Sequence, residues 1–248
     1  MKLPFKINLE NKVCVVTGAG GVICSHLARA LAQCGAKVAL LDLNKDSAEV
    51  FAKEIREEGG IAYAYEANVL KKDSLEACHR EILKDLGKCD ILINGAGGNN
   101  PRATTDNEYA ELGDEKKGIK TFFDLDEAGV EFVFNLNFIG TLLPTQVFAC
   151  DMVGRQDCSI LNISSMNAFT PLTKIPAYSG AKAAISNFTK WLAVHFSHVG
   201  IRCNAIAPGF FVTKQNEKLL YNEDGTPTPR TGKILASTPM GKFGNVDD

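Results

Sequence analysis

The chain has 248 residues, of which 45% are apolar and 23% are charged, and its formal net charge is −2. Such a chain is long enough to fold without disulfides, and we expect one α/β domain spanning residues 1–248. The near-zero charge gives no reason to expect a nucleic-acid or membrane partner, and no apolar run reaches the roughly 18 residues of a spanning helix. The eight cysteines form no CxxC pair, which favours free thiols in a reducing cytoplasm and no metal site.

The first part of the chain alternates short apolar runs with segments of helical periodicity. Strands are expected at 12–17, 37–41, 61–66 and 89–93, and helices at 22–34, 46–58 and 72–86. Strands separated by helices form parallel βαβ units with right-handed crossovers. The predicted fold is a doubly wound, Rossmann-type α/β sheet with helices on both faces.

The turn after the first strand is rich in glycine and opens a helix. Backbone N–H groups of the segment 18–21, together with the dipole of the following helix, suit a pyrophosphate. Asp42 ends the second strand, where an acidic residue that binds an adenosine ribose is expected. Its carboxylate would repel a 2′-phosphate, which favours NAD over NADP. The alternative is a surface aspartate that caps the next turn.

A long polar insert, residues 98–125, follows the fourth strand and is expected to act as a substrate loop. Its asparagines and cations suit a polyhydroxylated anionic small molecule, although ordinary solvated loop residues would look the same. The candidate substrate residues here and further along the chain are Asn99, Asn100, Arg102, Asn167, Lys214, Gln215 and Asn216.

A serine, a tyrosine and a lysine stand at informative spacings in the second half of the chain. Ser165 ends an apolar run of strand type, and Tyr178 and Lys182 lie four apart in a helical segment, on one face. A lysine ammonium would pull the pKa of the phenol toward neutrality, and the serine could hold a substrate oxygen beside it. A tyrosine–lysine pair at this spacing is, by itself, also common on solvated helices.

Six motifs occur in the order typical of the short-chain dehydrogenase/reductase family, which the sequence resembles from Asn11 to its last residue. They are TGAGGVIC (17–24), INGAG (93–97), NLNFIG (135–140), NISS (162–165), YSGAK (178–182) and PGFFVT (208–213). The resemblance implies a single NAD-dependent dehydrogenase domain that assembles as a homotetramer. Two features depart from the family: Val22 and Cys24 replace the last two glycines of its TGxxxGxG turn, and its final helix and strand are absent, so six strands are expected.

The resemblance also implies roles for individual residues. Tyr178 would exchange a proton with the substrate oxygen, Ser165 would orient that oxygen, and Lys182 would lower the Tyr178 pKa and bind the nicotinamide ribose. Asn137 would hold a water that links Lys182 to solvent. The implied cofactor-binding residues are Gly18, Gly20, Gly21, Val22, Asp42, Asn68, Val69, Asn94, Gly95, Lys182, Pro208, Gly209, Phe211 and Thr213.

Within the family, several segments resemble the bacterial D-mannonate oxidoreductases (fructuronate reductases) of the short-chain type. They include KLPFKINLENK, SSMNAFTPLTKIPAYS and NEDGTPTPR. This resemblance implies reversible reduction of D-fructuronate to D-mannonate, with Asn99 and Asn167 on the substrate and Arg102 or Arg230 on its carboxylate. The alternatives are a short-chain dehydrogenase for a neutral ketose, polyol or ketogluconate, and a dinucleotide-binding sensor without catalysis.

Overall fold

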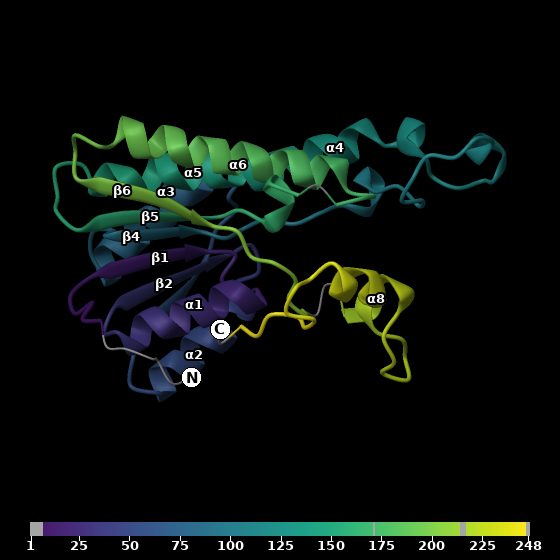
Figure 1. Ribbon diagram of the computed structural model, residues 1–248. Coiled ribbons are helices and arrows are strands. Elements are labelled where there is room, and N and C mark those ends of the chain that lie inside the picture. The colour runs from purple at the N-terminus through teal and green to yellow at the C-terminus, as the bar shows by residue number, and fades with distance from the viewer. Residues whose placement is uncertain (1–6, 171, 214–216, 247–248) are drawn as a thin grey trace. The chain divides into compact units, whose positions relative to one another are not determined.

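The computed structural model describes residues 7–170, 172–213 and 217–246. It divides into two compact units, residues 2–207 and 208–248, and each is described here by itself. The larger unit holds a six-stranded parallel sheet of order β3-β2-β1-β4-β5-β6 (Figure 1). Its strands are β1 (Val13–Thr17), β2 (Lys37–Asp42), β3 (Ile61–Glu66), β4 (Ile91–Asn94), β5 (Cys158–Ile163) and β6 (Ile201–Ile206). The predicted doubly wound sheet of six strands is confirmed, whereas the single domain stays a prediction.

Helices cover both faces of this sheet (Figure 1). One face carries α1 (Val22–Gln33) and α2 (Lys45–Glu57), and the other carries α3 (Lys72–Asp85), α5 (Gly140–Phe148) and α6 (Pro176–His195). Successive residues of β1 enter opposite cores: Val13 and Val15 pack toward α3, whereas Cys14 and Val16 pack toward α1. A strand buried on both sides must be apolar at every position, which explains the continuous apolar runs in the sequence.

The carboxyl ends of the central strands meet at one edge of the sheet. Thr17 of β1 is in register with Asn94 of β4, which is in register with Asn162 of β5. The Asn94 side chain donates to Asn162 Oδ1 and to Thr145 Oγ1 of α5, at 2.9 Å each. β1 and β4 are parallel, but the order in which successive strands are added to the sheet reverses between them, and ligands of such sheets bind in the crevice at this switch point.

One continuous helical segment, Glu127–Asp151, departs from the sequence prediction. It contains α4 (Glu127–Phe134), a π-helical turn η4 (Asn135–Ile139), α5 and η5 (Ala149–Asp151). It has 25 residues, and an 18-residue window of it has a mean hydropathy of 1.3, so by length and composition alone it could cross a membrane; the sequence analysis did not single it out. Half of its apolar window is buried inside the protein, and its Thr141 and Thr145 hydroxyls bond to carbonyls one turn back, as in a core helix.

The insert has three short 3-10 turns, η1 (Pro101–Ala103), η2 (Asp114–Lys116) and η3 (Phe122–Asp124). Its backbone is tied to other elements: the Thr105 N–H donates to the Lys174 carbonyl at 2.9 Å, and the Asp126 N–H donates to the Arg102 carbonyl at 3.2 Å. It projects past the N-terminal end of α6 (Figure 1). The insert is thus an ordered feature of the larger unit, and its role as a substrate loop stays a prediction.

The smaller unit contains α7 (Glu217–Leu220), α8 (Pro229–Ala236) and a β-bridge between Phe211 and Gly244. Four predicted cofactor residues belong to it, namely Pro208, Gly209, Phe211 and Thr213, and so does Arg230. Their contacts with a nicotinamide or a substrate therefore stay predictions. Lys214, Gln215 and Asn216 lie outside the described residues.

Candidate active site

Ser165, Tyr178 and Lys182 come together at the carboxyl edge of the sheet. Ser165 follows β5, and the other two lie in the first two turns of α6, which Pro176 starts at a position where its missing N–H costs nothing. The Tyr178 side chain shares a hydrogen bond with Ser165, and Lys182 Nζ lies 5.6 Å from the centre of the tyrosine ring. The structure confirms the proximity that the spacing predicted.

Asn137 lies in the π-helical turn η4 and is fully buried. Its Nδ2 donates to the carbonyls of Gly98 at 2.8 Å and Val133 at 2.7 Å, and its Oδ1 accepts from the Gly98 N–H at 3.3 Å. A π-turn inside an α-helix often marks a functional site. This one holds the loop that follows β4.

The missing side chain of Gly97 leaves room for two candidate catalytic residues, and the sequence analysis did not single this glycine out. A Cβ atom on Gly97 would lie 2.7 Å from Asn137 Oδ1 and 3.2 Å from Lys182 Nζ. Asn137, from the π-helical turn η4, and Lys182, from α6, therefore both approach the Cα atom of Gly97. The signal available in the sequence was its place at the end of the INGAG motif.

Burial is the main influence on the pKa of both titrating candidate residues, Lys182 and Tyr178. Lys182 is 4% exposed, its Nζ donates to the Ile163 carbonyl at 2.8 Å, and burial lowers its pKa to about 8. Burial raises the pKa of Tyr178, and the hydrogen bond with Ser165 acts in the opposite direction. The expectation that Lys182 lowers the Tyr178 pKa is corrected: the ammonium bonds to a carbonyl, and desolvation of the phenol prevails.

The glycine turn after β1 has the features of a dinucleotide cradle. Gly18 has φ +66°, and the Gly20 N–H donates to Asp42 Oδ2 at 2.9 Å. A Cβ on Gly20 would lie 2.8 Å from Ser47 Cβ, so only glycine fits there. Gly21 caps α1 without a side-chain hydrogen bond, which leaves the first N–H groups of the helix to an anion. These residues fit a pyrophosphate.

Asp42 caps the adjoining turns and keeps acceptor capacity for the predicted cofactor role. Its Oδ2 accepts from Gly20 and its Oδ1 accepts from the Asn44 N–H at 3.0 Å, so it does hold the adjoining turns. Each carboxylate oxygen has a second lone pair, which leaves both able to accept from a ribose hydroxyl. The turn-capping reading and the cofactor reading are compatible.

The departures from the family's glycine turn fit the fold. Gly95 lies in the loop that follows β4, and a Cβ atom on it would lie 2.1 Å from Cys24 Sγ. The Cys24 thiol therefore occupies the space that the missing side chain of Gly95 leaves open. Burial raises the pKa of Cys24 to about 12 and keeps it a neutral packing group. Val22 begins α1, and its carbonyl accepts from the Ser25 hydroxyl at 2.9 Å.

The remaining predicted cofactor residues of the larger unit differ in their burial and in the hydrogen bonds that their side chains form. Asn68 Oδ1 accepts from the Leu70 N–H at 2.9 Å, and Val69 is nearly buried and packs on Gly140. The Asn94 side chain is 2% exposed and is used inside the sheet. Asn94 Nδ2 thus ties β4 to β5 and α5 next to Gly95, its Oδ1 is buried without a partner among the described residues, and its contact with a cofactor stays a prediction.

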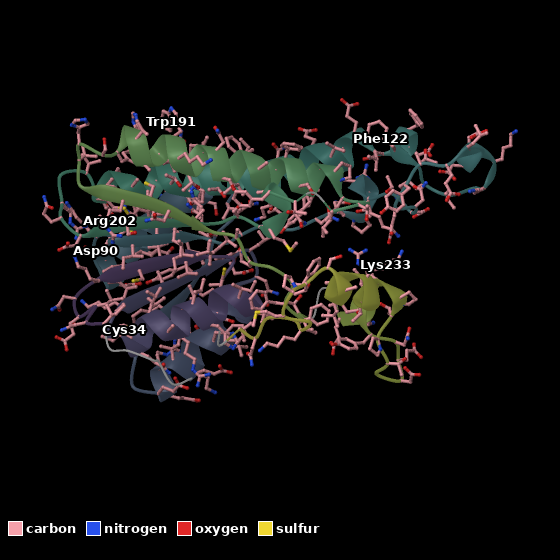
Figure 2. The ribbon with its side chains drawn as sticks, in the orientation of Figure 1. Cys34, Asp90, Phe122, Trp191, Arg202 and Lys233 are labelled. Atoms are coloured by element: carbon pink, nitrogen blue, oxygen red, sulfur yellow. The ribbon has the colours of Figure 1, made fainter. Side chains whose placement is uncertain are left out.

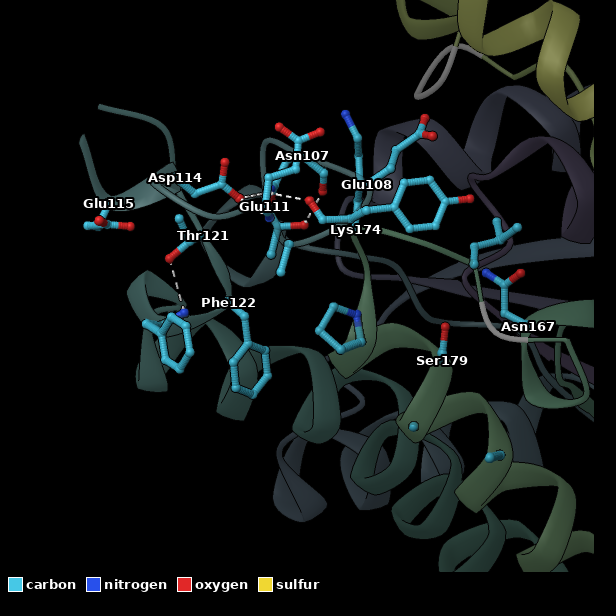
Figure 3. A pocket seen from close by; sticks show the side chains of 18 of the residues that line it. Asn107, Glu108, Glu111, Asp114, Glu115, Thr121, Phe122, Asn167, Lys174 and Ser179 are labelled. Atoms are coloured by element: carbon cyan, nitrogen blue, oxygen red, sulfur yellow. Dashed lines mark hydrogen bonds between the residues drawn. The ribbon is translucent and has the colours of Figure 1, made fainter. Parts of the chain in front are cut away.

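Only one of the named substrate residues of the larger unit, Asn167, lines the cavity of about 690 Å³ beside the insert (Figure 3). Arg102 pairs with Asp126 at 2.7 Å, and Asn99 Nδ2 donates to Thr104 Oγ1 at 3.0 Å, so both hold the insert together. The sequence analysis did not single out the other polar residues of this cavity, which are Thr105, Asn107, Glu108, Glu111, Asp114, Glu115, Thr121, Lys174 and Ser179.

Far from this edge, His79, Cys150 and Asp151 bring their ligating atoms within 4.8 Å of one another. His79 Nε2 lies 2.8 Å from Asp151 Oδ2, which also accepts from the Cys89 N–H at 3.0 Å. This pairing connects α3 to the end of the Glu127–Asp151 segment. The eight cysteines, all described, are free.

Comparison with known proteins agrees with a dinucleotide-dependent dehydrogenase. Residues 12–224 match the family model described as short chain dehydrogenase. An uncharacterized oxidoreductase of Haemophilus influenzae is 62% identical over all of this chain and 87% of its own length, and the uncharacterized oxidoreductase UxuB of Bacillus subtilis is 50% identical over 99% and 87%. The crystal structure, with bound NAD, of a candidate D-mannonate oxidoreductase from Haemophilus is 63% identical, with a TM-score of 0.93 over 97% of this chain and 86% of that one. The chain belongs to the short-chain dehydrogenase family.

Proposed function

We propose that this enzyme transfers hydride reversibly between NADH and a keto sugar acid, reducing D-fructuronate to D-mannonate. The observation that carries the proposal is a complete Asn137, Ser165, Tyr178 and Lys182 set at the carboxyl edge of the sheet. It occurs in a chain 63% identical to an NAD-bound candidate D-mannonate oxidoreductase. Asp42 at the end of β2 supports NAD rather than NADP, because its carboxylate would repel a 2′-phosphate.

The proton chemistry falls to Ser165 and Tyr178. NADH, when bound, supplies the hydride that reaches the carbonyl carbon. The two hydroxyls, already hydrogen-bonded to each other, hold the carbonyl oxygen, and the Tyr178 O–H donates its proton to that oxygen as negative charge develops. A raised Tyr178 pKa keeps the phenol protonated at neutral pH, which suits donation. The alcohol product thus gains one hydride and one proton.

Lys182 and Asn137 support that transfer. The Lys182 ammonium uses one N–H on the Ile163 carbonyl and retains two donors for a ribose and for resupply of the Tyr178 proton. A pKa of about 8 lies close to working pH, where a group both accepts and releases protons readily. Asn137 keeps the Gly97–Gly98 loop against Lys182 and so fixes where the ammonium sits.

The test is oxidation of NADH with D-fructuronate, beside NADPH and beside neutral ketoses, for the wild type and Tyr178→Phe. We expect turnover with NADH and fructuronate that falls by about 10²–10⁴-fold in the variant, because the proton donor is lost while the ring remains. Tyr63→Phe, on the half-exposed side of β3, is the matched control and should retain wild-type activity.

Three results would contradict the proposal. Activity confined to neutral ketoses would exclude a keto sugar acid while leaving the mechanism intact. Tight NADH binding without turnover of any ketone would instead make the protein a dinucleotide-binding sensor. An unchanged rate in Tyr178→Phe would remove Tyr178 from the chemistry.

A further inference from the structure

Cys24 is the third residue of α1, and it is buried, with 5% exposed, against the loop that follows β4. α1 lies on one face of the sheet, and side chains fill the space between them (Figure 2). A Cβ atom on Gly95 would lie 2.1 Å from Cys24 Sγ. The same Cβ atom would lie 3.0 Å from the Thr17 carbonyl oxygen and 3.5 Å from Ile163 Cγ1. The sulfur therefore lies near the point where the ends of β1, β4 and β5 meet.

Two segments of backbone at this point also enclose the Lys182 ammonium. Ile163 packs in the same hydrophobic cluster as Cys24, and its carbonyl oxygen accepts from Lys182 Nζ at 2.8 Å. The loop that begins at Gly95 reaches the ammonium two residues later, where a Cβ atom on Gly97 would lie 3.2 Å from Lys182 Nζ. Cys24 thus supports both segments from the helix that carries the predicted pyrophosphate site.

The Cys24 thiol and the Lys182 ammonium are close enough to influence each other electrostatically. Burial raises the pKa of Cys24 to about 12, and the charge of Lys182 opposes this rise. The thiol is therefore neutral at working pH and does not offset the charge of the lysine. Cys24 acts on Lys182 as a neutral group that occupies space next to it.

Few other groups around the ammonium titrate. They are Tyr178 on its own helix and, beyond Cys24, Asp42 of β2. The carbonyl of β5 and the Asn137 side chain of η4, which face it from the other elements, do not titrate. Because burial is the main influence on the Lys182 pKa, that pKa depends on how completely water is excluded here.

We propose that Cys24 is a positioning residue for Lys182: its side chain keeps water from the ammonium and holds the Gly95–Gly97 loop and the end of β5 around it. The proposal rests on the proposed function, in which Lys182 serves a ribose and the Tyr178 proton. Removal of the sulfur would leave room for about one water molecule, with a carbonyl and the ammonium as its polar partners.

The experiment compares wild type with Cys24→Ala, which removes the sulfur and keeps a good helix former. Reduction needs the ammonium, so kcat/KM for fructuronate should fall above the Lys182 pKa of about 8. In Cys24→Ala we expect this falling limb to move up by about 0.5–1 pH unit, because water removes part of the desolvation. kcat at neutral pH should drop by about 3- to 10-fold as the ammonium loses its fixed position, with little change in the KM for NADH.

Cys78→Ala is the matched control, because this cysteine is equally buried in a helix, α3, on the opposite face of the sheet. It should keep the pH profile of wild type. An upward shift in Cys78→Ala as large as that in Cys24→Ala would show a general loosening of the core and overturn the proposal.

Gly95→Ala offers a rescue from the other side of the contact. Its Cβ atom would lie 2.1 Å from the position of the removed sulfur, so Cys24→Ala combined with Gly95→Ala should return the pH profile toward that of wild type. A double variant that behaves like Cys24→Ala alone would mean that filling this space has no effect on Lys182, and the proposal would fail.

A second measurement needs no substrate. The free energy of unfolding in urea, for wild type relative to Lys182→Met, should rise between roughly pH 7.5 and 10, and with Cys24→Ala in both proteins this rise should shrink by about a third. A smaller rise in a protein that does not reduce fructuronate would support the role of Cys24 and contradict only the proposed function. An unchanged rise together with an unchanged pH profile would overturn the role of Cys24 and leave the function standing.

Discussion

At the scale of single residues, Lys182 shows how burial changes the pKa of a candidate catalytic side chain. The protein interior disfavours its charge and lowers its pKa from 10.5 to about 8, while the Ile163 carbonyl holds the ammonium in place. Tyr178 responds to the same environment in the opposite direction, because burial of a phenol disfavours its anion. Both groups are therefore poised by their surroundings more than by each other.

The lowered pKa of Lys182 predicts a pH dependence of stability. Below pH 8 both the folded and the unfolded chain carry the charge, and folding bears the whole cost of burying it. Between pH 8 and 10.5 the unfolded chain binds more protons, so the free energy of unfolding rises with pH. We expect wild type to gain about 2 kcal/mol relative to Lys182→Met between roughly pH 7.5 and 10.

Urea unfolding of both proteins at the two pH values measures this difference. Lys190→Met, at an exposed position of the same helix, is the control and should show no such gain over that range. Parallel pH profiles for wild type and Lys182→Met would mean that Lys182 keeps an ordinary pKa in the folded protein.

At the scale of elements, the contact between α1 and the end of β4 decides whether the altered glycine turn can work. Close approach of this helix to the sheet brings its N-terminus to the cofactor groove. The side chain of Cys24 contacts the backbone of Gly95 there. Cys24 is larger than the glycine of the family motif, and the missing side chain of Gly95 leaves room for its Sγ atom. The two positions should therefore depend on each other.

A double-mutant cycle tests this dependence. Gly95→Ala should destabilise the protein by about 1–3 kcal/mol, because its Cβ would overlap Cys24 Sγ. Cys24→Gly should relieve much of that loss, giving a coupling energy within about 0.5–3 kcal/mol. Gly98→Ala is the control, since its Cβ would make an ordinary contact 3.8 Å from Leu136. Additive effects at positions 95 and 24 in chemical denaturation would show that they do not touch.

At the scale of the whole molecule, the outer side of α5 and α6 is the surface that bears on assembly. Trp191 is 55% exposed and stacks on His195 with ring centres 4.5 Å apart. The two residues line, with Phe188 and Leu142, a second cavity of about 590 Å³ between these helices. An exposed apolar groove of this kind is typical of a protein interaction surface.

We propose that the protein is a homotetramer that covers this groove. Because Trp191 is the single tryptophan, its emission maximum should lie at the blue wavelengths of a buried indole in the assembled protein. Trp191→Arg should shift the mass measured by light scattering to a smaller species, since a charge would be buried at the interface. A monomeric wild type with the emission of an exposed indole would contradict the proposal.

Local patterns in the sequence were enough to predict the sheet and the glycine turn, and spacing together with the family resemblance pointed to the four candidate catalytic positions, whose roles stay predictions. The predicted strands agree with the observed ones to within about two residues, because a strand buried on both faces is an unbroken apolar run. Tertiary structure alone decided that Arg102 pairs with Asp126, that Asn137 and Lys182 both approach Gly97, and that Ser179 joins Asn167 in one cavity. These facts depend on contacts between residues that are far apart in the chain. Burial, which sets the direction of the Lys182 and Tyr178 pKa shifts, also arises only in the folded protein. Neither long-range contacts nor burial can be read directly from the order of residues along the chain.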